Sequence, residues 1–279
     1  MKLIENGTFD AERAFYESEG VTVKNCIFDG PADGESAFKE SRDVTVKDCV
    51  WRLRYPFWHD EGVTMQGTEL TDTCRAAFWY SRDIKVVDSK LHGAKALREC
   101  EDIDLTECDV VSDEFGWSCQ RVAVTNCHAE GAYFMMRSTG LRLEGVTLTG
   151  KYSFQYIEDA EFVNCHFDTK DAFWHAKRVV VRDSVIRGEY LGWYAEDITF
   201  ERCRIIGTQP LCYCKNLTMI DCEMVDADLS FEKSSVQATL TAPVISIKNP
   251  LSGRITVPAV GEIIREDERY QGEIIFTGE

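Results

Sequence analysis

The sequence predicts an all-β protein, a single-stranded right-handed parallel β-helix (a solenoid) of about 14 coils with a 19-residue period. The first observation is a strand-like block that returns along the chain, for example at residues 21–26, 44–49 and 122–127. The second is the step between blocks, which stays at 19 residues from Ile84 to Ile255. The third is the absence of any stretch with the length and spacing of a helix. A period held this long is typical of stacked units that bury their apolar faces against their neighbours.

The first strand of each repeat is predicted from its alternation of apolar and polar residues. Its third position is apolar in every coil, as at Val23, Val46 and Val86. Its fifth position is mostly Asn or Asp, as at Asn25 and Asp48, and these residues tolerate left-handed backbone angles and mark a sharp turn. Another apolar position follows and defines a second short strand. Right-handed winding is expected because connections between parallel strands favour that hand.

A third strand precedes each block and begins with an uncharged column that should point inward, as at Phe38, Phe57 and Phe78. The next two columns carry charged side chains in several coils, so they should point outward, because burying an unpaired charge is costly. A column of small residues, such as Ser41 and Ser81, then returns to the interior. The two outward columns predict an exposed aromatic stripe that we expect to bind substrate, made of Trp58, Trp79, Tyr80, Trp117, Tyr156, Trp174, Trp193, Tyr194 and Tyr213.

Three uses of this aromatic stripe are open from the sequence. Flat rings interleaved with polar side chains suit stacking against the sugar rings of a glycan. The same residue types are enriched at protein interfaces, so the stripe could also mediate self-association. In the third interpretation the rings only stack on one another. Soluble proteins seldom expose an apolar surface of this extent without using it, which favours the first two.

Three features of the sequence resemble those of a known family. They are the Asn/Asp–Cys pair that closes many strands, the segment at residues 77–81 and the C-terminal sequence at residues 258–264. They resemble a bacterial domain-of-unknown-function family, number 3737, whose members are similar to pectin-lyase-like right-handed parallel β-helix proteins. The resemblance covers nearly the whole chain. It implies the fold and brings no established activity.

Candidate catalytic residues lie beside the aromatic stripe. Glu99 is the candidate general acid or base, His59 and His175 are candidates for proton transfer, and Arg137 is a nearby cation. In the alternative interpretation, all four are solvated residues of a charged surface. The paired-Asp, Gly-His-Gly and Arg-x-Lys signatures of glycoside hydrolases on this fold are missing, which argues against a polygalacturonase-like activity.

The amino-acid composition limits the classes of binding partner and the cellular location that we expect. The formal net charge of −17 argues against binding to nucleic acid or to an anionic membrane surface, and no apolar run is long enough to span a bilayer. The chain opens without an apolar leader. Many of the 12 cysteines fall in columns that hold Ser, Thr or Ala in other coils, which is typical of small buried groups. We therefore expect reduced thiols and a cytoplasmic location, with no cofactor and no metal site.

One continuous register predicts a single solenoid over residues 1–258, followed by a C-terminal cap or hairpin arm over residues 259–279. A homodimer is expected, because an uncapped N-terminal strand edge and the aromatic stripe both need cover. The function that fits best is a carbohydrate-interacting protein, with glycan hydrolase or lyase chemistry as its enzymatic form. The alternative is a non-catalytic scaffold or oligomerisation protein whose aromatic stripe binds protein.

Overall fold

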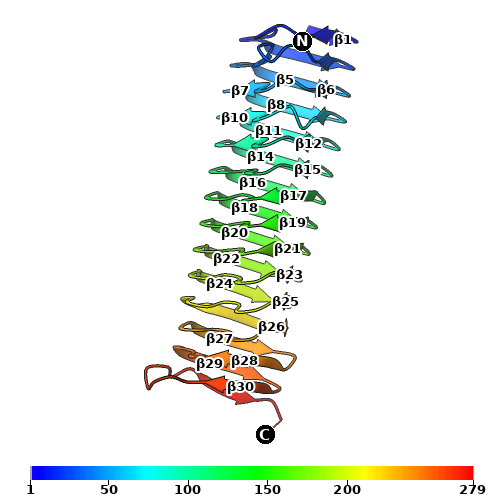
Figure 1. Cartoon of the computed structure of the whole chain (residues 1–279). Helices are drawn as coiled ribbons and strands as arrows, with labels where there is room; N and C mark the ends of the chain where they lie inside the picture. The colour runs from blue at the N-terminus through cyan, green and yellow to red at the C-terminus, as the bar shows by residue number, and fades with distance from the viewer. Residues whose placement is uncertain (1, 279) are drawn as a thin grey trace. The chain divides into compact units, whose positions relative to one another are not determined.

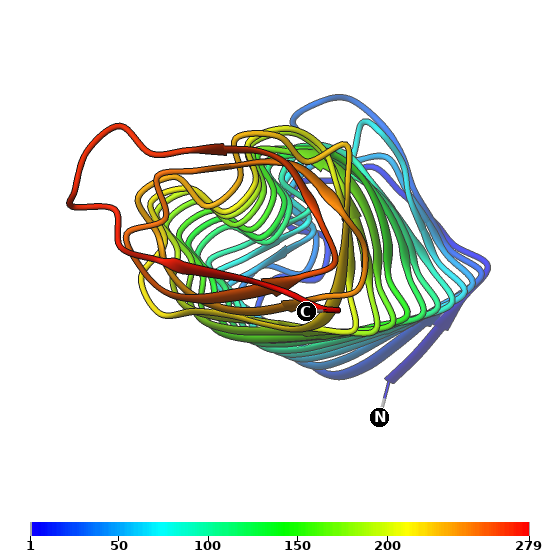
Figure 2. The same ribbon diagram turned by 90° about the horizontal axis from the view of Figure 1, so that it is seen from below.

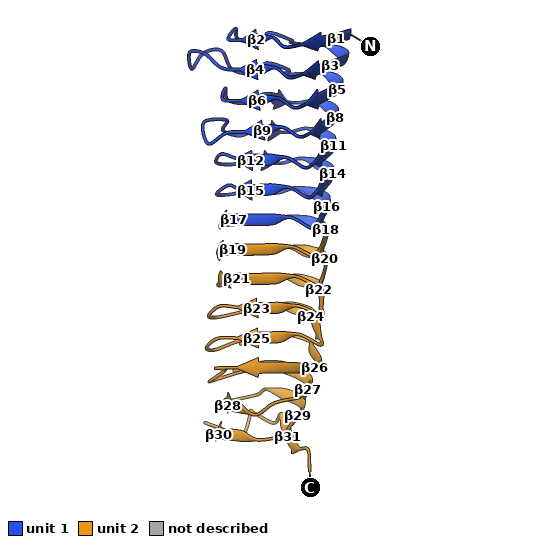
Figure 3. Ribbon diagram, turned by 90° about the vertical axis from the view of Figure 1, so that its right-hand side faces the viewer, with its two compact units in different colours: residues 1–142 blue, residues 143–279 orange. Residues whose placement is uncertain are grey.

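The computed structural model of the protein describes residues 2–278, which form strands and turns with no α-helix (Figure 1). The chain divides into two compact units, Met1–Arg142 and Leu143–Glu279, called unit 1 and unit 2 (Figure 3). Within residues 2–278 there is accordingly no helix that could cross a membrane. Each unit is built from parallel strands of successive coils, so the predicted right-handed parallel β-helix is confirmed.

Unit 1 contains three columns of strands. Its longest strands pair in register and confirm the predicted repeat, with Val44 opposite Val63 and Ile84 opposite Ile103. These long strands are β1 (Lys2–Glu5), β3 (Glu19–Lys24), β5 (Arg42–Lys47), β8 (Glu61–Gln66), β11 (Arg82–Val87), β14 (Glu101–Thr106) and β16 (Gln120–Thr125). The second column consists of β2 (Thr8–Phe9), β4 (Ile27–Phe28), β6 (Val50–Trp51), β9 (Glu69–Leu70), β12 (Lys90–His92), β15 (Asp109–Val111) and β17 (His128–Ala132). The third consists of β7 (Phe57–Trp58), β10 (Phe78–Trp79) and β13 (Leu97–Arg98).

Unit 2 repeats the first two of these columns, and the boundary between the units falls within β18 (Thr139–Glu144). Its long strands are β20 (Glu158–Val163), β22 (Lys177–Arg182), β24 (Glu196–Glu201), β26 (Leu217–Val225), β27 (Ser235–Leu240), β29 (Ser252–Val257) and β31 (Glu273–Phe276). Its second column consists of β19 (Thr147–Lys151), β21 (His166–Lys170), β23 (Val185–Arg187) and β25 (Arg204–Ile206), and β28 (Val244–Lys248) pairs with β30 (Val260–Ile264).

The predicted 19-residue step is wrong at its last position. Ile255 pairs with Ala238 rather than with Val236, because Gly253 lies opposite Val236. A Cβ on Gly253 would lie 2.0 Å from the carbonyl oxygen of Val236, so only glycine fits where an apolar residue stands in other coils. The apolar pattern of β29 is therefore displaced by two residues relative to the repeat.

The C-terminal segment continues the parallel pairing. Strand β30 pairs in parallel with β28, and β31 pairs in parallel with β29, with Ile255 opposite Ile274. The hairpin expected over residues 259–279 is therefore wrong, because these strands pair with the preceding coil and not with each other. Figure 2 shows the segment between β30 and β31, in red, projecting outside the coils of unit 2. A capping role for residues 259–279 stays a prediction.

Stacked side chains fill the interior of each unit. In unit 1, the rings of Phe28 and Trp51 lie 3.6 Å apart at an interplanar angle of 4°, and neither side chain is exposed. The turn column behaves as predicted, since Asn25 and Asp48 both have φ of 51°. All 12 cysteines are free and buried. Their column is held by hydrogen bonds along the stack, in which the Cys49 sulfur accepts the N–H of Cys26 at 3.4 Å.

Candidate functional site

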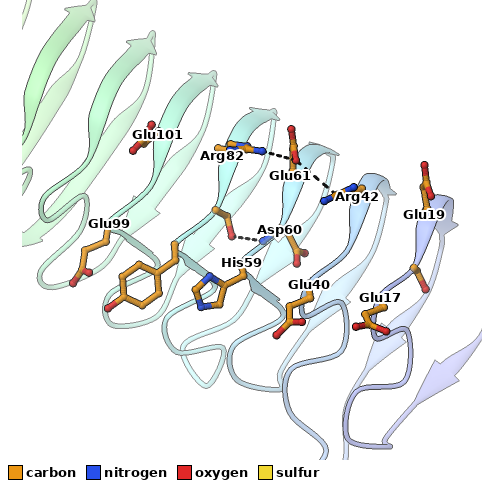
Figure 4. A pocket seen from close by; sticks show the side chains of 13 residues that line it. Glu17, Glu19, Glu40, Arg42, His59, Asp60, Glu61, Arg82, Glu99 and Glu101 are labelled. Carbon is orange, nitrogen blue, oxygen red and sulfur yellow. Dashed lines mark hydrogen bonds and ion pairs between the residues drawn. The ribbon is translucent and has the colours of Figure 1, made fainter.

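A groove of about 710 Å³ runs along the coils of unit 1, beside the turn that leads from each third strand into the next long strand (Figure 4). It is called the polar groove below. Its lining residues come from three adjacent columns, and the two outer columns each contribute one residue per coil. They are Glu17, Ser18, Glu19, Glu40, Arg42, His59, Asp60, Glu61, Tyr80, Ser81, Arg82, Glu99 and Glu101.

The first wall of the polar groove is the corner column, formed by Glu17, Glu40, His59, Tyr80 and Glu99. All five have left-handed backbone angles, with φ between 51° and 62°. This conformation is uncommon for residues other than glycine, and here it turns the chain so that the side chains project outward. The rings of His59 and Tyr80 stack at 5.1 Å, and a hydrogen bond to Glu99 raises the pKa of Tyr80. The structure thus brings His59, Tyr80 and Glu99 together, as the sequence predicts.

The second wall is the entry column, where each long strand begins. Its residues are direct partners in neighbouring strands and alternate in charge, in the order Glu19, Arg42, Glu61, Arg82, Glu101. Arg82 lies 2.7 Å and Arg42 lies 3.8 Å from the same Glu61 carboxylate oxygen (Figure 4). These cations lower the pKa of Glu61, the hydrogen bond from Arg82 being the largest cause. Glu61 is therefore ionised and paired.

The floor of the polar groove contains a buried carboxyl group, that of Asp60, which is only 1% exposed. Its Oδ1 accepts the N–H of Ser41 at 3.0 Å, and its own N–H is donated to the Ser81 hydroxyl at 3.0 Å. Its Oδ2 is buried and has no hydrogen-bond partner. Burial raises the pKa of Asp60 to about 8, and the nearby charge of Glu40 adds to the increase. At neutral pH Asp60 is therefore mainly a neutral acid.

Sequence reasoning missed Asp60 as a special residue and treated it as part of a solvated edge. The sequence did contain an indication of this role, because Asp60 stands in the column of small residues that also holds Ser41, Ser81 and Cys100. These side chains form a hydrogen-bonded ladder, since the Cys100 sulfur accepts the N–H of Ser81. An ionisable residue in a column of buried hydroxyls and thiols is unusual and indicates a special role.

Acidic side chains outnumber basic ones in the lining of the polar groove. Seven carboxyl groups and two arginines line it. Three further cations outside the lining balance part of this charge. Lys39, Arg98 and Arg121 approach Glu40, Glu99 and Glu101 to 3.8, 3.2 and 2.7 Å respectively. Arg98 and Arg121 also pair with Glu114 and Asp102 outside the groove, so the polar groove keeps an excess of negative charge.

Three tryptophans of unit 1, Trp58, Trp79 and Trp117, lie in a column next to the corner column. Trp58 and Trp79 stack at 5.9 Å, Lys39 lies 4.5 Å from the Trp58 ring, and Arg98 lies 5.7 Å from Trp79 and 5.0 Å from Trp117. Neighbouring rings and cations therefore occupy their faces. Stacking of a sugar on this part of the aromatic stripe would require an open ring face, whereas mainly the ring edges are available.

Unit 2 carries the remaining aromatic residues of the predicted stripe. Tyr156, His175, Tyr194 and Tyr213 form a continuous stack, with ring centroids 4.9, 5.0 and 4.8 Å apart. Beside it, Trp174 and Trp193 stack at 5.4 Å, and their indole N–H groups donate to the carbonyl oxygens of Tyr190 and Gln209. His175 therefore lies between two tyrosine rings.

Arg137 belongs to unit 1, is exposed and has φ of 59°, but does not line the polar groove. Within residues 2–278, no group of three or more His, Cys, Asp or Glu side chains is placed to hold a metal ion. The polar groove offers a neutral buried acid beside carboxylates and guanidinium groups.

Several solved structures are similar to this chain. The mannuronan C-5 epimerase AlgE4 A-module of Azotobacter vinelandii is 10% identical, with 85% of this chain and 89% of that chain covered and a TM-score of 0.34. The tailspike protein of E. coli bacteriophage HK620 is 7% identical, with 98% and 70% covered and a TM-score of 0.32. The catalytic domain of a GH87 alpha-1,3-glucanase is 9% identical, with 98% and 64% covered and a TM-score of 0.32.

Similarities this low tell nothing of activity, and no curated protein matches the sequence. The match to a protein family is extensive by contrast, since it spans residues 2–275. This chain belongs to the family described as protein of unknown function (DUF3737).

Proposed function

We propose that the polar groove of unit 1 binds a neutral carbohydrate chain. The observation that carries this proposal is the arrangement of the groove as parallel columns, with one carboxylate, guanidinium or ring edge per coil in each wall. Neighbouring coils repeat at about 4.8 Å, so an elongated ligand meets similar groups at regular steps. Sugar hydroxyls both donate and accept hydrogen bonds, which suits walls where carboxylates and arginines alternate.

The charge of the polar groove decides between classes of glycan. A uronic acid polymer would bring a carboxylate to each sugar and would be repelled by the excess of acidic lining residues. Elimination by a lyase acts on such uronates. A neutral chain avoids this repulsion, and cleavage of a neutral chain proceeds by hydrolysis. The lining therefore favours a hydrolase over a lyase as the enzymatic form of this function.

Binding is tested by affinity electrophoresis and calorimetry against neutral polysaccharides, with polyuronates as a comparison. Arg82→Ala removes a groove cation and should weaken binding by a factor of 10 or more, which corresponds to about 1.4 kcal/mol. Lys85→Ala is the matched control, because Lys85 is an exposed cation on the same strand β11 and lies outside the groove. Equal affinities of both variants, or no neutral polysaccharide that binds, would contradict the proposal.

A second candidate function is a protein-binding scaffold, which the aromatic stack of unit 2 favours. Tyr156 is 44% exposed and Tyr194 is 47% exposed, so their outer edges form an apolar surface with polar tips. Tyrosine is enriched at protein interfaces. The expected homodimer belongs to this candidate. Light scattering at micromolar concentration should give twice the chain mass, and Tyr194→Ser should shift it toward the monomer; a monomer mass for the unaltered protein would remove the homodimer.

A further inference from the structure

We infer that Asp60 is the proton donor of a glycosidic hydrolysis in the polar groove, with Glu40 as the base that activates water. This inference rests on the proposed function and adds to it a reaction and the residues that perform it. Its starting point is geometric. Asp60 is a carboxyl group on the floor of the groove, one of its oxygens is held by the Ser41 N–H, and its other oxygen has no partner.

The surroundings of Asp60 suit a proton-holding group. General acids in glycosidases are carboxyl groups kept neutral by an apolar or like-charged environment. Burial and the charge of Glu40 together raise the pKa of Asp60 to about 8, so the proton stays bound at neutral pH. Figure 4 shows Asp60 next to His59 in one coil, with Glu40 on the preceding coil. His59 and Glu40 are both exposed. The proposed proton transfer requires a side-chain movement that opens the buried Oδ2 to the bound sugar.

Glu40 has the complementary environment. Its carboxylate accepts the hydroxyl of Tyr16 at 3.0 Å and lies 3.8 Å from the ammonium group of Lys39. Glu40 is also exposed to solvent. The two carboxyl groups therefore differ in environment, because Asp60 is buried and Glu40 is solvated and lies beside a cation. Such a difference is what assigns the acid and the base in a hydrolase.

The reaction follows from these two states. The proton on Asp60 Oδ2 passes to the glycosidic oxygen as the bond between that oxygen and the anomeric carbon breaks. A water molecule bonds to the anomeric carbon through its oxygen and gives one proton to Glu40. The products are two sugar chains, each with a new hydroxyl group, and a proton exchange with solvent returns Asp60 to the acid and Glu40 to the carboxylate.

The floor column supplies a variant that separates catalysis from folding. Serine occupies the same column at Ser41 and Ser81, where its hydroxyl accepts the N–H of a neighbouring coil. Asp60→Ser therefore retains the hydrogen bond to Ser41 and removes only the acid. Asp60→Asn retains the shape of the side chain. Asp104→Ser, at an exposed aspartate of β14 outside the groove, is the control for loss of a carboxylate.

The experiment measures new reducing ends from the neutral polysaccharide that binds best, together with affinity. We expect Asp60→Ser and Asp60→Asn to bind normally and to hydrolyse at least about 100-fold more slowly, and Glu40→Gln to show a similar loss. The unaltered protein should lose activity as pH rises through about 8, where Asp60 ionises. Full activity of Asp60→Ser, or a polysaccharide that binds without being hydrolysed, would overturn the inference and leave the proposed function standing. If no neutral polysaccharide binds, both fail.

Discussion

The indole of Trp58 stacks on the indole of Trp79, with centroids 5.9 Å apart and planes inclined by 18°, although the two residues lie on successive coils. Strand pairing sets this contact, because Trp58 and Trp79 are direct partners in β7 and β10. The same pairing places Arg98 beyond Trp79. Trp58 and Trp79 therefore support one another before they contact any ligand.

This contact predicts that Trp79 contributes mainly to stability. Trp79→Ala removes the stack on Trp58 and the cation–π contact with Arg98, and should lower the free energy of unfolding by about 2–4 kcal/mol. Urea denaturation measures the loss. Tyr80→Ala is the neighbouring control, because Tyr80 is 45% exposed and its removal should cost less. A smaller loss for Trp79 than for Tyr80 would show that the stack is not structural.

The buried acid predicts that stability depends on pH. The pKa of Asp60 is raised to about 8 in the folded protein and is near 4 when the chain is unfolded. The folded state therefore holds the extra proton between these values, and stability falls as pH rises from about 4 to about 8, by up to about 1.4 kcal/mol per pH unit. Asp60→Ser should flatten this slope in urea titrations between pH 5 and pH 9. An unchanged slope would assign the dependence to other groups.

The close contact between Gly253 and the Val236 carbonyl oxygen predicts that alanine destabilises the protein more at position 253 than at a glycine with open space around it. Gly253→Ala would place a methyl group 2.0 Å from the Val236 carbonyl oxygen at a φ of 96°, so the strands β27 and β29 must separate. Gly20 also has a positive φ, of 64°, but a Cβ there would meet nothing within 4 Å. Gly20→Ala should therefore cost only about 1–2 kcal/mol, and Gly253→Ala should cost more. Thermal melts of both variants compare them directly.

The burial of the cysteines predicts how the thiols react with a labelling reagent in solution. All 12 cysteines are free and buried, so a thiol reagent should label few of them in the native protein and all 12 in denaturant. Cys100→Ser should change stability by less than about 1.5 kcal/mol, because serine occupies the same column at Ser81. Fewer than 12 thiols in protein taken from its native compartment would argue against the proposed cytoplasmic location.

The strand columns could be predicted from sequence because a single position repeats many times. Val23, Val46 and Val86 occupy equivalent sites, and the average over coils removes the ambiguity of any one of them. The register failed at Ile255 because a glycine, which has no side chain to signal burial, stands at the column position of Val236.

The candidate site was only partly predictable. The outward direction of His59, Tyr80 and Glu99 followed from charges in their column, whereas the polar groove depends on how three columns meet at a turn. The burial of Asp60 could not be read from its neighbours His59 and Glu61, which are more exposed. It depends on the residues one coil away, Ser41 and Ser81, which hold it by hydrogen bonds.

The alternation of Glu19, Arg42, Glu61, Arg82 and Glu101 also restricts how this part of the chain can grow or shrink. Deleting the single repeat that carries Glu61 would set Arg42 against Arg82, and duplicating it would set two glutamates face to face. Removal or insertion of two repeats preserves the pairing of opposite signs. A redesign that lengthens or shortens this part of the solenoid should therefore add or remove an even number of repeats.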